Sequence, residues 1–244
     1  MVEAYLFRSY QLFTLTTLYK MPDLEKIATQ LESHNSKDRL LALTALREVA
    51  PEDAVPLIKK VLNDEILPVR SMAVFALGVK PTAECFPILI NLLQSDLDYG
   101  IRADAAGALG YLNDIRAFEH LTRAFYEDDN WLVRFSAAVS LGNLQDIRAK
   151  KLLMEALDSK EVILQQAAIA ALGEIKAVEA VEKILTFATS DDWLIRQRIA
   201  EALGKLDTVK SRSALKFLAK DSHSQVKEAA QLSLEGLESA EKSD

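Results

Sequence analysis

The residue types best suited to catalysis or metal binding are few in this sequence and lie far apart. One cysteine, Cys85, and three histidines, His34, His120 and His223, are all that the 244 residues supply. The sequence has no His–Glu pair and no Cys-x-x-Cys pair, which are spacings typical of protein-bound zinc or iron. It also lacks a glycine-rich phosphate loop. We therefore predict no catalytic residue, no metal site and no resident cofactor.

The remaining candidates are large apolar, aromatic and charged side chains that suit the binding of another molecule. Tryptophan, tyrosine and arginine are favoured anchors at protein interfaces, and a carboxylate in apolar surroundings attracts cations. What these side chains do depends on the elements that position them. The candidates are Met72, Phe75, Tyr99, Asp104, Trp131, Phe135, Val139, Trp193 and Arg198.

The tract Leu-Val-Arg-Phe-Ser-Ala-Ala-Val-Ser-Leu-Gly, at residues 132–142, recurs along the chain. The reference position of each copy is its last residue, and these positions are 31 or 32 residues apart. A fixed period of this length predicts a solenoid of stacked units, not a domain with one central core. Each copy is identified by two residues, the one eight before the reference and the reference itself. The seven pairs are Arg39/Arg47, Arg70/Gly78, Arg102/Gly110, Arg134/Gly142, Gln165/Gly173, Arg196/Gly204 and Lys227/Glu235.

Each unit is predicted to form two antiparallel helices. Apolar residues stand eleven and fifteen positions after each reference, and a spacing of four places them on one face of the first helix. The second helix has a core residue nine before the reference and a leucine one before it. We expect acids such as Asp128, fourteen before the reference, to cap this helix. We expect the reference glycine to end it in a left-handed conformation.

The pattern Asp-x-x-x-x-Val-Arg-x-x-Ala-Ala-x-Ala-Leu-Gly resembles HEAT repeats, in particular the short type named after phycobilisome lyases. Asp128, Val133-Arg134, Ala137-Ala138 and Leu141-Gly142 are among the pieces that carry it. The resemblance covers roughly residues 22–236 and implies an all-α fold, a right-handed α-solenoid of about seven HEAT-like helix pairs. It also implies that the arginine row is a structural ladder between adjacent repeats.

The predicted organisation is a capping helix at 1–21, the repeat solenoid at 22–236 and a polar tail at 237–244. The first twenty residues are apolar in places but too polar to span a membrane, which leaves a transient amphipathic contact as the alternative. The net charge of −7 argues against nucleic acid as a partner. A single cysteine fits a reducing cytoplasm, without stable membrane insertion.

The second helix of each unit has another face, away from the core, that resembles the concave wall of HEAT-like arrays. Large apolar side chains on a face that should be solvated predict a binding site. A trough holding Asp104 is expected between Phe75 and Phe135, and the face becomes polar further along, at Gln166, Gln197, Arg198 and Glu201. In the middle repeats it carries Met72 and Phe75, then Ala103, Asp104 and Gly107, then Phe135, Ser136 and Val139.

An aromatic row stands eleven residues before the reference, in the turns between helices. It consists of Tyr99, Trp131 and Trp193. One interpretation is that each tryptophan fastens its own turn to the next repeat. The other is that the row forms a rim that anchors a partner. The acids beside it are predicted mainly as helix caps, and they would also make the rim electronegative.

These observations support a non-catalytic scaffold that holds another protein in its concave face. The resemblance implies a phycobiliprotein or an assembly factor as client, in a photosynthetic cell such as a cyanobacterium.

It also implies an alternative: an enzyme subunit that attaches, isomerises or detaches a transiently bound linear tetrapyrrole, with Asp104 near the pyrrole nitrogens and Arg198 near a propionate. The Tyr-Tyr-Ala-Ala-Trp-Trp-Leu-Gly tract of the lyase E-type subunits is replaced here by Phe-Ser-Ala-Ala-Val-Ser-Leu-Gly at 135–142, which disfavours this alternative. A generic signalling adaptor is a third possibility.

Overall fold

The computed structural model describes residues 23–241 and is helical, without a strand, over that range. The predicted all-α class is therefore confirmed. No helix between residues 23 and 241 is long and apolar enough to cross a bilayer. The α-helices are α2 (Leu24–Leu31), α3 (Ser36–Ala45), α4 (Pro51–Lys59), α5 (Leu67–Val79), α6 (Cys85–Ser95), α7 (Tyr99–Leu112), α8 (Phe118–Glu127), α9 (Trp131–Asn143), α10 (Lys150–Ala156), α11 (Val162–Glu174), α12 (Val181–Leu185), α13 (Trp193–Leu203), α14 (Val209–Leu218) and α15 (Ser224–Glu241). Short 3₁₀ helices are η1 (Leu46–Glu48), η2 (Ile115–Ala117), η3 (Ile147–Ala149) and η4 (Val178–Ala180).

The chain divides into two compact units, residues 1–73 and 74–244. The described part of the first unit holds α2, α3, η1, α4 and the beginning of α5. The capping helix expected at 1–21 lies outside the described residues. At the other end, α15 continues past residue 236 to Glu241 and buries Leu237. The first residues of the expected polar tail are therefore part of a packed helix.

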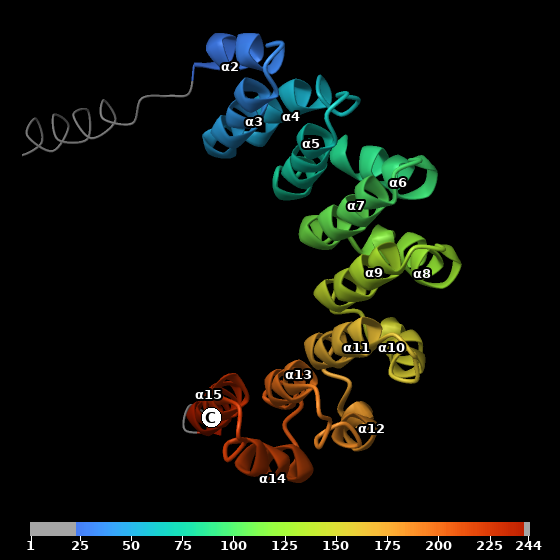
Figure 1. Ribbon diagram of the computed structural model, residues 1–244, viewed down its shortest axis with the longest axis vertical. Coiled ribbons are helices and arrows are strands. Elements are labelled where there is room, and N and C mark those ends of the chain that lie inside the picture. Colours follow the sequence, from blue (N-terminus) through green and yellow to red (C-terminus); the bar gives the residue numbers. More distant parts are fainter. Residues whose placement is uncertain (1–22, 242–244) are drawn as a thin grey trace, which may run out of the picture. The chain divides into compact units, whose positions relative to one another are not determined.

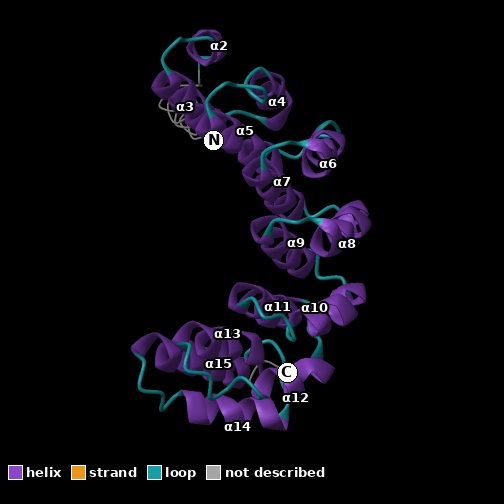
Figure 2. Ribbon diagram, turned by 45° about the vertical axis from the view of Figure 1, so that its right-hand side comes forward, coloured by secondary structure: helices purple, strands orange, loops and turns teal. Residues whose placement is uncertain are grey.

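The helices of the second unit alternate between two rows (Figure 1). The inner row, on the concave side of this unit, consists of α7, α9, α11, α13 and α15, and each of these helices packs against the next. The outer row consists of α6, α8, α10, α12 and α14. Figure 2 shows the same alternation from another side, with short loops between the rows. This two-row arrangement is the predicted stack of helix pairs.

The core follows the predicted stripe eleven after the reference and the stripes of the second helix. The stripe fifteen after the reference is buried at Leu93, Phe125 and Leu157 but only partly buried at Leu62, Ala188 and Ala219. Leu121 on α8 and Val133 and Leu141 on α9 have no exposed surface. The corresponding residues of the other described repeats are also buried. They are Ile58, Leu89, Leu153, Ile184 and Leu215 for the first helix, and Val69, Ile101, Leu164, Ile195, Leu77, Leu109, Leu172 and Leu203 for the second.

The reference glycines bring neighbouring inner helices together. A Cβ on Gly110 would lie 2.6 Å from Ser140 Oγ, and one on Gly142 would lie 2.8 Å from Ala171 Cα. The expectation that these glycines end helices in a left-handed conformation is wrong, because no described glycine has a positive φ. Left-handed backbone occurs three residues after a reference glycine instead, at Asn113, Gln145 and Lys176.

The arginine row forms the expected ladder between repeats. Arg102 on α7 donates to both carboxylate oxygens of Asp128, at 2.8 and 3.0 Å, and to the carbonyl of Asp96 at its own turn, at 3.0 Å. Arg196 binds Asp221 in the same way, at 2.7 and 2.9 Å. We call each such set of contacts a rung of the ladder. A rung fixes one inter-helix turn and connects it to the next repeat.

The rungs stabilise the charged form of their acids. The hydrogen bonds from Arg196 lower the pKa of Asp221 from 3.8 to about 2, against the opposing effect of burial. Burial is the largest influence on Asp128 and raises its pKa, but the hydrogen bonds from Arg102 and a backbone N–H bring the pKa below its usual value. Charge pairing outweighs desolvation at both sites.

One rung is built differently. Gln165 occupies the arginine position of α11 and donates only to its own turn, to the carbonyl of Ser159 at 2.8 Å. The contact to the next repeat comes from Gln166, whose amide donates to Asp192 at 2.9 Å. Two neutral glutamines thus share the two tasks of one arginine.

The helix caps lie two residues later than predicted. Asp98, Asn130 and Asp192 accept hydrogen bonds from the first backbone N–H groups of α7, α9 and α13. Asp128 instead accepts the arginine of the preceding repeat and the N–H of Asn130. The acid fourteen before the reference is therefore a ladder residue and not a helix cap.

Candidate functional site

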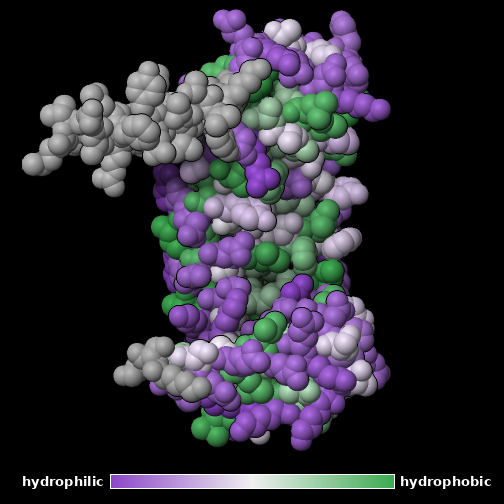
Figure 3. Space-filling view, turned by 90° about the vertical axis from the view of Figure 1, so that its left-hand side faces the viewer, coloured by the Kyte–Doolittle hydropathy of each residue, from purple (hydrophilic) through white to green (hydrophobic). Residues whose placement is uncertain are grey.

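Large apolar side chains are exposed on the second-unit part of α5 and on α7, where the inner row begins. Phe75, on the part of α5 that belongs to the second unit, is 50 % exposed, and its ring meets the ring of Tyr111 edge to face, with centroids 5.6 Å apart. Tyr111 is 61 % exposed and stands at the end of α7, with Val79 also exposed. Sequence reasoning missed Tyr111, although it directly follows a reference glycine. Figure 3 shows this face as pale to green over its middle and mostly purple toward the C-terminal helices.

Asp104 and Ala103 are neighbours on α7 but differ in their exposure to solvent. Asp104 is partly exposed, as expected for the inner face, and it already interacts with a neighbouring group. Ala103 is only 3 % exposed, so its predicted place on the open face is wrong. The equivalent Gln166 on α11 is also buried, and it bonds to the next repeat. The position seven before the reference is therefore buried on α7 and α11, whereas Phe135, at the same position of α9, is partly exposed.

Phe135 and Val139 on α9 are partly exposed, so each also contributes to packing. They lie on the same helix row as Tyr111 and extend the apolar surface. Met72 belongs to the first unit, where its sulfur lies 4.0 Å from the hydroxyl of Thr44. We define the apolar wall as the second-unit residues Phe75, Val79, Tyr111, Phe135 and Val139.

The aromatic row divides into two kinds of residue. Trp193 begins α13 and stacks on His223 of the next repeat, with ring centroids 4.3 Å apart and planes 10° apart. It therefore fastens its turn to the next repeat. Tyr99 and Trp131 begin α7 and α9 and are about half exposed. Their surfaces are open to a partner.

Arg198 does not join Asp104 in one site. Its guanidinium donates to Glu201 on the same helix, α13, at 2.7 Å. Asp104 is on α7, and α9 and α11 stand between these helices in the inner row. The two side chains therefore cannot act on the same small group.

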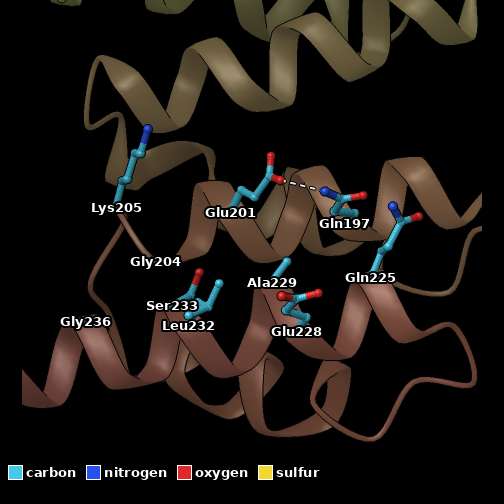
Figure 4. A pocket seen from close by; sticks show the side chains of 10 residues that line it. All are labelled: Gln197, Glu201, Gly204, Lys205, Gln225, Glu228, Ala229, Leu232, Ser233 and Gly236. Carbon is cyan, nitrogen blue, oxygen red and sulfur yellow. Dashed lines mark hydrogen bonds between the residues drawn. The ribbon is translucent and has the colours of Figure 1, made fainter.

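A hollow of about 560 Å³ lies between α13 and α15, where sequence reasoning placed no site. Figure 4 shows side chains from both helices facing it. The hollow arises from the separation of two helices in adjacent repeats, which the sequence pattern does not reveal. Its lining residues are Gln197, Glu201, Gly204, Lys205, Gln225, Glu228, Ala229, Leu232, Ser233 and Gly236.

Most hydrogen-bond donors of this hollow are already used. The Gln197 amide donates to Glu201 at 2.8 Å, and the Ser233 hydroxyl donates to the carbonyl of Ala200 at 2.9 Å. Lys205 forms a salt bridge with Glu174 of the preceding repeat. The hollow therefore offers mainly acceptor atoms.

Groups suited to metal or nucleophilic chemistry are not assembled in the described structure. Residues 23–241 contain no group of three or more His, Cys, Asp or Glu side chains able to hold a metal ion. Cys85 is buried, and its sulfur lies 3.2 Å from the carbonyl of Lys80.

The chain matches a family model described as HEAT repeats over residues 86–164 and 151–235. No curated protein matches the sequence significantly. Among solved structures, the complex of CpcE and CpcF of phycocyanin lyase from Nostoc sp. PCC7120 is 25 % identical, covering 75 % of this chain and 74 % of that chain, with a TM-score of 0.61.

Two further solved structures show the fold alone. A chain from a structure of Kap95p with RanGDP is 15 % identical, with a TM-score of 0.56 and coverage of 88 % of this chain and 35 % of that chain. An engineered protein is 22 % identical, with a TM-score of 0.51 and coverage of 88 % and 68 %.

Proposed function

Because the chain belongs to the HEAT-repeat family, we propose that it is a non-catalytic scaffold that holds a protein client on the inner row of its second unit. Stacked helix pairs present a long surface that suits an extended or convex partner. Fold alone does not specify function, so the proposal depends on the side chains of that surface.

The observation that carries the proposal is the exposure of the apolar wall. Phe75 and Tyr111 leave half or more of their surfaces open while the nearby core positions are fully buried. Aromatic side chains exposed together, with polar surroundings, are typical of the centre of a protein interface. Tyr99 and Trp131 add exposed aromatic surface at the start of the same helices.

The proposed client is a phycobiliprotein or an assembly factor, met in the cytoplasm. The likeness to the CpcE and CpcF complex of phycocyanin lyase supports this choice. The negative charge of the chain favours a client with a basic contact surface.

Phe75→Asp tests the proposal in a pull-down from native lysate. A carboxylate at the centre of the apolar wall should reduce client capture about tenfold or more, because the bound client would remove water from that charge. Phe217→Asp is the matched control, since Phe217 is 59 % exposed on α14 of the outer row. Equal capture by both variants, with unchanged helical circular dichroism, would refute the proposal.

A second candidate is a subunit that handles a linear tetrapyrrole, favoured by the same lyase likeness. In that role the partly exposed Asp104 would bind the pyrrole nitrogens beside the apolar wall. Arg198 would have no part, because it lies three inner helices away. The protein mixed with a linear tetrapyrrole should then shift its visible absorption, and Asp104→Ala should reduce the shift. An unchanged spectrum at high protein concentration would exclude this candidate.

A further inference from the structure

We infer that the hollow between α13 and α15 binds an arginine side chain of the client. This inference rests on the proposed scaffold function and adds the chemistry of one contact. Four features carry it: the acceptor-rich lining, an unpaired carboxylate, an exposed leucine and the position of the hollow in line with the apolar wall.

The bonds that Gln197 and Ser233 already donate fix which of their atoms are left to accept. Glu201 can only accept, so the amide nitrogen of Gln197 must face it and the amide oxygen must face away. Ser233 gives its only hydrogen to Ala200 and keeps acceptor capacity at Oγ. A ligand that fits these groups must bring donors of its own.

Glu228 supplies the charge. Its side chain is exposed and lines the hollow, and no other described residue pairs with its carboxylate. Glu201 is already satisfied by Gln197 and Arg198, and Lys205 by Glu174. Glu228 is therefore the carboxylate left for an incoming cation.

The shape of the lining favours arginine. A guanidinium has five N–H donors and no acceptor, so it can bind Glu228 and the amide oxygens of Gln197 and Gln225 together. Leu232 is 62 % exposed and lines the same hollow, where it can cover the aliphatic stem of the arginine side chain. The volume of about 560 Å³ exceeds that of one guanidinium and leaves room for the attached backbone.

The hollow continues the client surface. Leu232 and Glu201 stand three residues before their references, the register that Phe75 and Val139 occupy at the other end of the inner row. From α7 to α13 there are three helix-to-helix steps of about 8–10 Å each, or roughly 30 Å. An extended segment covers about 3.3 Å per residue, which places the arginine roughly nine residues from its apolar anchor.

Titration of the isotope-labelled full chain with the tripeptide Gly-Arg-Gly tests the inference by nuclear magnetic resonance. The amide signals of Gly204, Leu232 and Gly236 should shift in a saturable way. Gly-citrulline-Gly, which has the same shape without the charge, should leave them unchanged. Glu228→Gln should weaken binding about tenfold. Glu238→Gln, an exposed acid of α15 outside the hollow, should not weaken it.

Three results would overturn the inference: equal shifts with the citrulline peptide, unchanged binding by Glu228→Gln, or no saturable shift at the hollow. The pull-down with Phe75→Asp is read separately. If the peptide binds and that variant still captures the client, the scaffold proposal fails while the arginine site stands. If the peptide does not bind and Phe75→Asp no longer captures the client, the arginine site is refuted while the scaffold proposal stands.

Discussion

The two ends of the inner row share one packing scheme and carry different surfaces. Around α7 and α9 the surface is the apolar wall, and between α13 and α15 it is the polar hollow. Beneath both, a glycine meets a serine of the next helix: Gly110 meets Ser140, and Gly204 meets Ser233. Each serine also donates to a carbonyl of the helix that it meets.

This comparison separates the positions that stack the helices from those that meet a client. The reference position, the position two before it and the position eight before it hold neighbouring repeats together at both ends. The positions three before the reference and one after it leave side chains partly or fully exposed, as Phe75, Tyr111, Glu201 and Leu232 are. Side chains at these positions that are half or more exposed, such as Phe75 and Leu232, can therefore change with little effect on the stack.

The largest effect is expected from the shared packing. Gly110→Ala and Gly204→Ala should each lower the free energy of unfolding by about 2–3 kcal/mol, because the added Cβ meets a serine at less than normal contact distance. Gly107→Ala on the same helix α7 has open space and should raise it by about 0.5–1 kcal/mol. Urea denaturation measures all three. Equal stability of Gly110→Ala and the wild type would contradict a common packing scheme.

The charged rungs predict that the folded chain loses stability in acid. The pKa of Asp221 is about 2 in the folded chain, against 3.8 without its partners. A lowered pKa gives stability that is present above pH 3.8 and is lost as the pH falls toward 2, about 2 kcal/mol in all. Asp221→Asn should remove most of this dependence. Urea denaturation between pH 7 and pH 2.5 measures this dependence.

The smallest effect concerns the glutamine rung. Gln165→Arg should restore an arginine that keeps the bond to Ser159 and reaches Asp192, as Arg134 reaches Glu161. The gain should be about 0.5 kcal/mol, since such pairs are partly solvated. A loss of stability in thermal denaturation would mean that the repeats around α11 are spaced differently from their neighbours.

The repeat and its core were predictable because burial follows helical spacing directly. Leu121 and Val133 are buried as their register requires. The role of Gly110 was not predictable, since a glycine that ends a helix and one that lets two helices approach look the same in a sequence. The hollow at Glu228 and the contact between Phe75 and Tyr111 depend on distances between repeats, which a pattern within one repeat does not contain.

Site-specific photo-crosslinking tests the central claim most directly. A benzophenone side chain would replace Tyr111 of the inner row or, as a control, Tyr126 of α8 in the outer row, which is 54 % exposed against 61 %. We expect the client to be crosslinked from position 111 and not from position 126. Crosslinking from position 126 alone, or equally from both positions, would contradict the account.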